Sequence, residues 1–301
     1  MAYFVGLDSG GTKTECWLGD ETRILGKAKT TTVKLTRVSQ EVATARLHEL
    51  LAEVSQQSGV PLSRVSRTCM GVAGYTIAEV REWAHRVVAE RVSGEVIVCG
   101  DEEIALDAAF RGGAGILLIG GTGSAVIGRC ADGTRCKAGG WGPGIGDEGS
   151  GFWIGREAVR RAFHSLDREV PTTLMEAIRT AWGVKDLGEI VAFANAQPGP
   201  DLSALTPAVV ACAEAGDSVA GTILKDAGVE LTRQVAVVWA KMRAHGEISA
   251  GVAYTGSVVE KIAVARESMR TQIAADCPGL TVVDGAINAM DGAMWRARQL
   301  G

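Results

Sequence analysis

Two short segments of this chain, residues 10–13 and 120–124, have the composition of phosphate-binding turns. Both contain Gly-Gly-Thr, and each lies between two apolar runs, which predicts a strand, a turn and a second strand. Glycine lets backbone N–H groups approach an anion closely, and Thr or Ser hydroxyls add donors. One such hairpin alone is typical of an ordinary turn, but two in matching contexts indicate a duplicated nucleotide-binding fold. The residues expected to hold a nucleotide here are Gly10, Gly11, Thr12, Lys13, Gly121, Thr122, Gly123 and Ser124.

Two aspartates follow apolar runs and are candidates for metal binding and acid–base chemistry. Asp8 ends the first predicted strand, where a carboxylate can hold Mg²⁺ through water molecules. Asp101 lies at a strand-to-helix junction, a position that opens into the ligand crevice of open α/β sheets. The alternatives are a plain turn residue for Asp8 and a helix N-cap for Asp101. Acidic residues further along the same predicted helix are poorer candidates: Glu102, Glu103 and Asp107.

A dense glycine-rich segment, residues 139–151, has the composition of a polar ligand pocket. Carboxylates can accept hydrogen bonds from sugar hydroxyls, and an aromatic ring can cover a sugar face. A tight structural loop is the alternative interpretation. The residues of this segment that we expect to contact a substrate are Gly140, Trp141, Gly142, Asp147 and Glu148.

Other glycine motifs carry weaker signals. Gly144, Gly146 and Gly149 match the dinucleotide-binding spacing, but no strand precedes them, so we reject that interpretation. No P-loop motif occurs. Gly256 and Ser257 follow a predicted strand and open a predicted helix, which could lie against an adenosine or a phosphate.

The bulk composition argues against several classes of function. The chain has 301 residues, 47% hydrophobic and 22% charged, so it can build a sizeable core. A net charge of −4 and few aromatic residues argue against nucleic acid as a partner. No apolar run approaches the roughly 18 residues of a membrane span and no signal peptide is recognised, so we expect a cytoplasmic protein. Of the seven cysteines, Cys16, Cys69 and Cys99 lie in apolar runs and are interpreted as buried thiols. Cys130 and Cys136, on either side of a predicted turn, could pair or bind a metal.

The elements that must position these groups form two similar halves. In the first, strands and helices alternate after an opening run of three strands, and Thr76 and Glu79 predict a capping box before one helix. The second half restarts the pattern and adds a run of helices. The expected strands are near residues 3–7, 15–19, 23–28, 65–72, 96–99, 116–119, 125–127, 248–254 and 280–283, and the expected helices near 39–58, 76–91, 101–110, 151–165, 172–182, 186–196, 203–216, 217–245 and 285–299.

A break at residues 111–115 suggests the domain boundary. We predict an N-terminal domain of residues 1–113, joined by the C-terminal helix at about 289–301. The C-terminal domain is predicted to span residues 114–288 and to carry the helical insertion.

Taken together, these motifs resemble the superfamily of sugar kinases, Hsp70 and actin, and within it the BadF/BadG/BcrA/BcrD-type ATPases. Residues 10–12 and 121–124 resemble the two phosphate loops, and Gly256-Ser257 resembles the adenosine motif. The most specific match is segment 139–151, which resembles the sugar segment of N-acetylglucosamine kinases. Asp101 falls at the place of the catalytic base.

The resemblance implies an α/β fold of two ribonuclease H-like (actin-like ATPase) domains with an active-site cleft between them. It implies a kinase that uses ATP and Mg²⁺ to phosphorylate the 6-hydroxyl of an amino sugar, with Asp8 on the metal. N-acetylglucosamine is the first substrate expected, and glucosamine and N-acetylmuramic acid are alternatives. A non-kinase ATPase that acts on a protein partner is the competing class of function.

One position departs from the resemblance. Related amino-sugar kinases place an Asn against the sugar in the loop after the third strand, but residues 30–36 contain none. Lys34 falls near that place, and a cation there would suit an acidic substituent on the sugar. We therefore expect Lys34 to contact the substrate, and we also expect the protein to form a homodimer.

Overall fold

The computed structural model describes residues 1–285 and 287–299, which form two compact units. Unit 1 combines residues 1–113 with the C-terminal segment that begins at residue 287, and unit 2 begins at residue 114 and comprises the chain between them. Among the described residues, none of the helices combines the length and the apolar composition that a membrane span needs.

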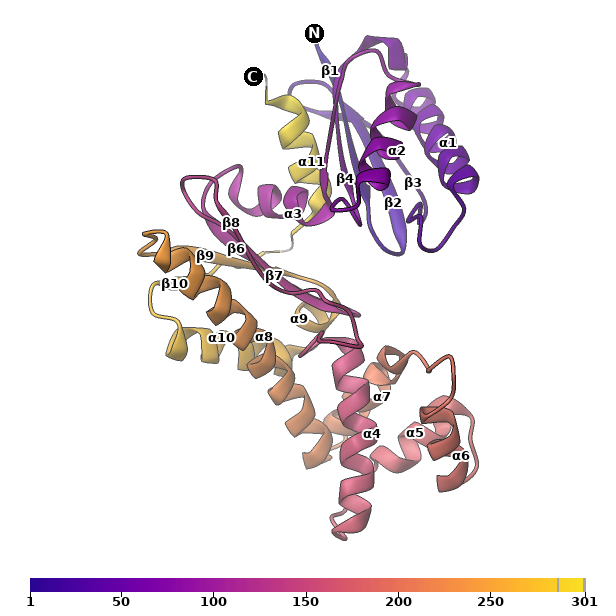
Figure 1. The fold of residues 1–301 in the computed structure, drawn as a ribbon, viewed down its shortest axis with the longest axis vertical. Coiled ribbons are helices and arrows are strands. Elements are labelled where there is room, and N and C mark those ends of the chain that lie inside the picture. Colours follow the sequence, from indigo (N-terminus) through magenta and orange to yellow (C-terminus); the bar gives the residue numbers. More distant parts are fainter. Residues whose placement is uncertain (286, 300–301) are drawn as a thin grey trace. The chain divides into compact units, whose positions relative to one another are not determined.

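Unit 1 is a five-stranded mixed sheet with helices on both faces (Figure 1). Its elements are β1 (Tyr3–Ser9), β2 (Lys13–Gly19), β3 (Ile24–Thr31), α1 (Gln40–Ser58), the short 3₁₀ helix η1 (Leu62–Arg64), β4 (Val65–Val72), α2 (Ala78–Ala89), β5 (Glu95–Gly100), α3 (Asp101–Phe110) and α11 (Ala289–Arg298). The strand order is β3-β2-β1-β4-β5. The first three strands pair antiparallel, whereas β4 and β5 continue the sheet in parallel. Parallel strands need crossover connections, which α1 and α2 supply.

The two faces of this sheet are packed differently. Helices α1 and α2 cover one face through a large apolar core that includes Leu7, Leu47 and Trp83. On the other face, glycines in the strands let α3 and α11 approach closely. A Cβ on Gly71 of β4 would lie 2.4 Å from the side chain of Ile104 in α3. The start of α3 is therefore held directly against the sheet.

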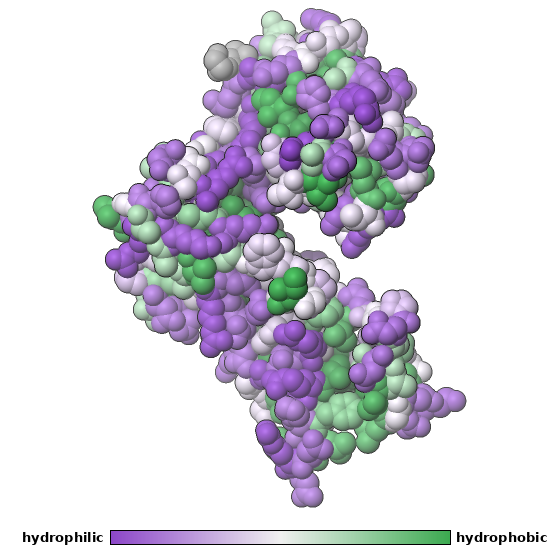
Figure 2. All heavy atoms as spheres, in the orientation of Figure 1, coloured by the Kyte–Doolittle hydropathy of each residue, from purple (hydrophilic) through white to green (hydrophobic). Residues whose placement is uncertain are grey.

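Unit 2 repeats the sheet and inserts a group of helices (Figure 1). Its elements are β6 (Gly115–Gly120), β7 (Ser124–Arg129), β8 (Arg135–Gly139), α4 (Gly151–Asp167), α5 (Leu174–Trp182), α6 (Leu187–Ala194), η2 (Leu202–Leu205), α7 (Thr206–Glu214), α8 (Ser218–Ala244), β9 (Ala250–Thr255), α9 (Ser257–Lys261), α10 (Ala263–Asp276) and β10 (Leu280–Val282). The strand order is β10-β9-β6-β7-β8, with β6, β7 and β8 antiparallel and β9 parallel to β6. Hydrophobic residues gather over the insertion on the face drawn in Figure 2. The exposed large hydrophobic residues of the insertion include Leu187, Val191 and Phe193 of α6.

Most of the predicted strands and helices are confirmed within a few residues, and three features differ. An additional strand, β8, directly precedes the glycine-rich segment and ends at its first residue, Gly139, and α10 is a helix of its own. The capping box at Thr76 is wrong, because Ile77 is the N-cap of α2. A turn closed by the hydrogen bond from Ile77 N to Gly74 O delays the start of this helix.

The cysteines are buried free thiols, so Cys130 and Cys136 do not form the disulfide considered above. Within the described residues, no group of three or more His, Cys, Asp or Glu side chains is placed to hold a metal ion.

Candidate functional site

The first glycine-rich turn joins β1 to β2 in unit 1 and leaves backbone donors open. Gly10 N donates to Lys13 O at 3.1 Å, whereas the N–H groups of Gly11 and Thr12 donate to no described residue. A Cβ on Gly11 would meet no atom within 4 Å. The turn therefore presents free N–H groups beside open space, as an anion-binding turn must.

Asp8 and Asp101 come together on the face of the sheet that α3 covers. Asp8 pairs in register with Gly71 of the neighbouring strand. A Cβ on Gly71 would lie 3.3 Å from the Cα of Asp101, so the missing side chain makes room for the first residue of α3. Gly100 is the N-cap of this helix, and the N-cap interpretation of Asp101 is therefore wrong. The Asp101 carboxylate accepts a hydrogen bond from Glu102 N at 3.1 Å and shares a second one with the Glu102 side chain.

Both aspartates have raised pKa values. Burial raises the pKa of Asp8 to about 6, partly offset by the positive charge of Lys13. Burial is also the main reason that the pKa of Asp101 rises to about 7. A side-chain hydrogen bond with Glu102 and the charges of Glu102 and Asp8 raise it further, whereas the hydrogen bond from the Glu102 N–H opposes the rise. A carboxyl group that ionises near neutral pH has the proton affinity that a general base needs.

The remaining acidic residues of α3 are paired with the C-terminal helix. Arg296 of α11 approaches Asp107 at 2.6 Å and Glu103 at 3.1 Å. Asp107 is fully buried, and this ion pair compensates its charge. These two acids are structural, which agrees with their lower rank in the sequence analysis.

The loop after β3 lies against the first glycine-rich turn. Thr32 Oγ1 donates to Gly10 O at 3.1 Å, and Arg46 donates to Thr32 O at 2.6 Å. Lys34 is half-buried two residues further on, and Lys34 N donates to Thr32 Oγ1. The chain thus places Lys34 near the first turn of unit 1.

The second glycine-rich turn, between β6 and β7 in unit 2, uses some of its donors internally. Ser124 N donates to Asp147 Oδ1 at 3.3 Å, and Ser124 Oγ donates to Glu148 O at 2.8 Å. Gly121 N donates to Gly123 O. In the part of the chain that the structure describes, the N–H groups of Thr122 and Gly123 have no acceptor, so these two remain for an anion.

Gly256 brings the start of α9 to this turn. It has a φ of 106°, and a Cβ there would lie 2.5 Å from Gly120 O, so only glycine fits. Beside it is a cavity of about 400 Å³. Its lining residues are Gly121, Thr122, Gly151, Ser203, Thr206, Pro207, Val210, Ser257, Val258, Lys261 and Ile262.

Sequence reasoning missed the cavity wall that the insertion supplies. Ser203, Thr206, Pro207 and Val210 come from η2 and α7. Thr206 Oγ1 donates to Gly151 O at 3.0 Å, which fixes this wall to the start of α4. These residues form no motif, and only their packing reveals them.

Segment 139–151 is divided between exposed and buried groups. The Trp141 side chain is 68% exposed, whereas Asp147 is 6% exposed and has a left-handed φ of 66°. Burial raises the pKa of Asp147, and the N–H of Ser124 opposes the shift. The Asp147 carboxylate therefore faces the second glycine-rich turn, and Trp141 faces solvent.

A sequence model of the BadF/BadG/BcrA/BcrD ATPase family matches residues 5–295. The chain belongs to this family. The resemblance given above is thereby confirmed over nearly the whole chain.

Relatives of this BadF/BadG/BcrA/BcrD-type ATPase carry sugar-kinase names. It is 31% identical over 243 residues to the N-acetylmuramic acid/N-acetylglucosamine kinase of Clostridium acetobutylicum, covering 79% of each chain. It is 24% identical over 307 residues to the N-acetyl-D-glucosamine kinase of Dictyostelium discoideum, covering 96% of each. The solved structure of a candidate N-acetylglucosamine kinase from Chromobacterium violaceum matches with a TM-score of 0.75 at 24% identity, over 99% of both chains. That likeness confirms the predicted α/β fold of two actin-like ATPase domains.

The pairing of Asp101 with Glu102 predicts a titration that does not depend on any ligand. In the unliganded ATPase, the Asp101 carboxyl should titrate near pH 7 and that of Asp8 near pH 6. Glu102→Gln removes a neighbouring negative charge, so the pKa of Asp101 should fall while that of Asp8 changes less. Carbon-13 NMR of labelled aspartates, assigned with Asn variants, measures both. An Asp101 carboxyl that titrates below pH 5 in the parent would contradict the burial argument.

Proposed function

We propose that this protein is an ATP-dependent kinase that phosphorylates the 6-hydroxyl of an amino sugar, with N-acetylglucosamine as the first candidate. The observation that carries the proposal is the buried Asp101 carboxyl with its raised pKa, next to Asp8 in the unit that presents the first glycine-rich turn. The names of the two relatives support the choice of an amino sugar. Glucosamine and N-acetylmuramic acid remain the alternative substrates.

The residues of unit 2 fit a nucleotide. The apolar side chains of Pro207, Val210 and Ile262 form walls suited to a planar base, and the hydroxyls of Thr206 and Ser257 can serve the ribose. The free N–H groups of the turns in each unit would hold phosphate oxygens. Asp8 would hold Mg²⁺ through water, since Mg²⁺ takes few protein carboxylates. Bound Mg²⁺-ATP supplies the phosphoryl group and neutralises part of the charge that develops during its transfer.

Asp101 supplies the base. Its carboxylate would accept the proton of the attacking sugar hydroxyl, and a pKa of about 7 keeps a large fraction ionised at neutral pH. Segment 139–151 would position the sugar through Trp141 and the two acids that follow it. A homodimer and a cytoplasmic location stay predictions from the sequence.

Replacement of the base separates chemistry from folding. Asp101→Asn should lower kcat by about 10²–10⁴-fold, because the amide cannot accept the proton. The folded-state pKa of about 7 exceeds the ordinary value of about 3.9, so ionisation lowers stability as pH rises between these values. The neutral amide avoids this loss, and the variant should unfold at pH 8 no more easily than the parent. A coupled ADP-release assay and thermal unfolding measure the two effects.

Asp291→Asn, an exposed site on α11, serves as the control for this substitution. If Asp101→Asn turns over within about threefold of the parent, Asp101 is not the general base. ATP turnover that is independent of any amino sugar would favour the ATPase that acts on a protein partner.

The first glycine-rich turn can be tested without disturbing the fold. A Cβ on Gly11 meets no protein atom within 4 Å, so Gly11→Val should affect only a ligand that approaches this turn. We expect binding of Mg²⁺ with a non-hydrolysable ATP analogue to weaken about tenfold or more, since charge-assisted hydrogen bonds are lost. Calorimetry measures the affinity. Gly221→Val on α8, where a Cβ also meets nothing within 4 Å, should bind as the parent does, and equal affinities for both variants would contradict the prediction.

Lys34 tests the choice of sugar. If its ammonium pairs with an anionic substituent, Lys34→Asn should raise the ratio of kcat/KM on N-acetylglucosamine to kcat/KM on N-acetylmuramic acid. Arg37→Asn, an exposed residue of the same loop, controls for the loss of a positive charge. Steady-state kinetics on both sugars measure the ratio. An unchanged ratio would argue against an acidic sugar as the substrate, and N-acetylglucosamine or glucosamine would remain the expected substrate.

A further inference from the structure

A buried glutamine joins two parts of the proposed site within unit 2. Gln234 lies on α8 and is 8% exposed. Its Nε2 donates to Ser124 Oγ of the second glycine-rich turn and to Glu148 O of segment 139–151, each at 2.9 Å. Ser124 Oγ in turn donates to Glu148 O. Three elements far apart in the sequence thus meet at one amide.

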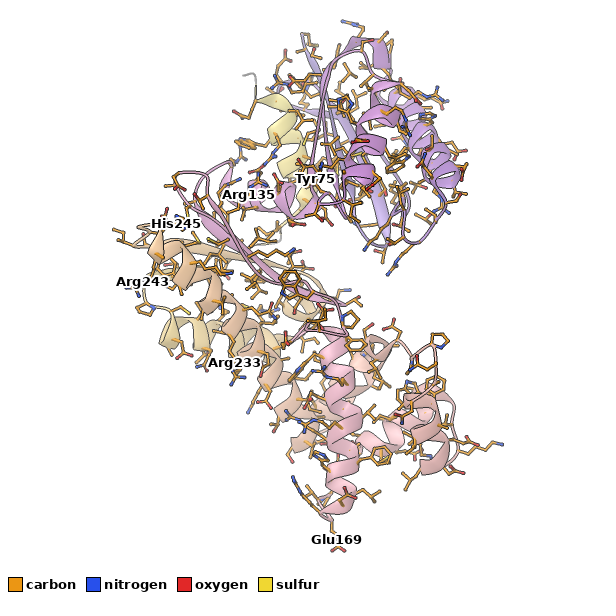
Figure 3. All side chains as sticks on the ribbon, viewed as in Figure 1. Tyr75, Arg135, Glu169, Arg233, Arg243 and His245 are labelled. Atoms are coloured by element: carbon orange, nitrogen blue, oxygen red, sulfur yellow. The ribbon has the colours of Figure 1, made fainter. Side chains whose placement is uncertain are left out.

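The surroundings of Gln234 are shaped to receive this amide. A Cβ on Gly139 would lie 2.2 Å from Gln234 Oε1, and Gly139 has a left-handed φ of 69°. The residue before Gln234 on α8, Arg233, extends into solvent, and its side chain is 68% exposed (Figure 3). The glutamine side chain is therefore directed at the turn and the segment by the helix register and by the glycine beside it.

Further hydrogen bonds run between the same two parts. Gly140 N donates to Ser124 O at 2.8 Å, and Ser124 N donates to the carboxylate of Asp147. Gly151 N donates to Gly121 O at 2.8 Å. The turn proposed to hold phosphates and the segment proposed to hold the sugar are consequently one hydrogen-bonded unit.

We propose that Gln234 is a positioning residue that couples ATP binding to amino-sugar binding. The inference rests on the proposed function. A sugar held by segment 139–151 restricts that segment and, through Gln234 and Ser124, the second turn. ATP then binds to a turn that is already ordered, so each ligand raises the affinity for the other by the same factor.

Gln234→Met tests the proposal with little change in volume. The Oε1 atom of Gln234 has no hydrogen-bond partner among the described residues, so methionine also removes a buried unpaired acceptor, and the Ser124–Glu148 hydrogen bond can persist. Thr232→Val is the matched control, because Thr232 is a buried polar residue of the same helix that bonds to Gly228 O and Met269 O instead.

The quantity to measure is the affinity for a non-hydrolysable ATP analogue with Mg²⁺, in the presence and absence of saturating N-acetylglucosamine. Coupling factors of this kind are typically about 5–150-fold. We expect Gln234→Met to reduce the parent's factor at least threefold, and Thr232→Val to keep it. At saturating sugar, KM for ATP should rise more in Gln234→Met than kcat falls.

If Gln234→Met phosphorylates the sugar and its coupling factor equals that of the parent, the inference is overturned and the proposed function stands. A parent that phosphorylates no amino sugar would overturn the proposed function itself. If Gln234→Met does not fold, Ser124→Ala removes the hydroxyl to which Nε2 donates. A loss of coupling in Ser124→Ala that equals the loss expected for Gln234→Met supports the proposal. A coupling factor equal to that of the parent contradicts it.

Discussion

The desolvation of Asp101 is the interaction on which the proposed chemistry depends. An aspartate in water is fully ionised at neutral pH and is a weak base, whereas burial beside Asp8 and Glu102 raises the pKa of Asp101 to about 7. That burial requires the start of α3 to lie directly on the sheet, which the missing side chain of Gly71 allows. Arg296 meanwhile compensates the charges of the other two buried acids of the helix, Glu103 and Asp107.

The two units share a strand–turn–strand plan but have diverged in what surrounds the turn. In unit 1 the turn stands beside two acids, and its N–H groups at Gly11 and Thr12 are open. In unit 2 the equivalent turn is tied to a glycine-rich segment through Ser124, and a cavity with apolar walls lies beside it. The same plan therefore lies beside the proposed base in unit 1 and beside a cavity with apolar walls in unit 2, and each turn has N–H groups that donate to no described residue.

The sequence predicts what is encoded locally. Apolar runs separated by glycine place the strands and both turns, and the junction after β5 points to Asp101. The start of α2 was mispredicted because a turn at Gly74 competes with the Thr76 cap. The cavity wall at Thr206 and the role of Gln234 could not be predicted, since both arise from contacts across long sequence separations. Gln234 and Ser124 are 110 residues apart, and neither belongs to a pattern that includes the other.

The last helix gives the chain a particular order of assembly. Unit 2 is contiguous in sequence, so all its strands and helices are available once they leave the ribosome. Unit 1 is different, because α11 packs on β1 from the opposite end of the chain: a Cβ on Gly6 would lie 3.0 Å from the Met294 sulfur. The apolar face that Phe4 shares with Ala293 and Ala297 stays open until α11 has been synthesised. A chain stopped before α11 would keep every proposed ligand-binding residue and still lack the guanidinium of Arg296, which compensates the buried charges of Asp107 and Glu103 in α3.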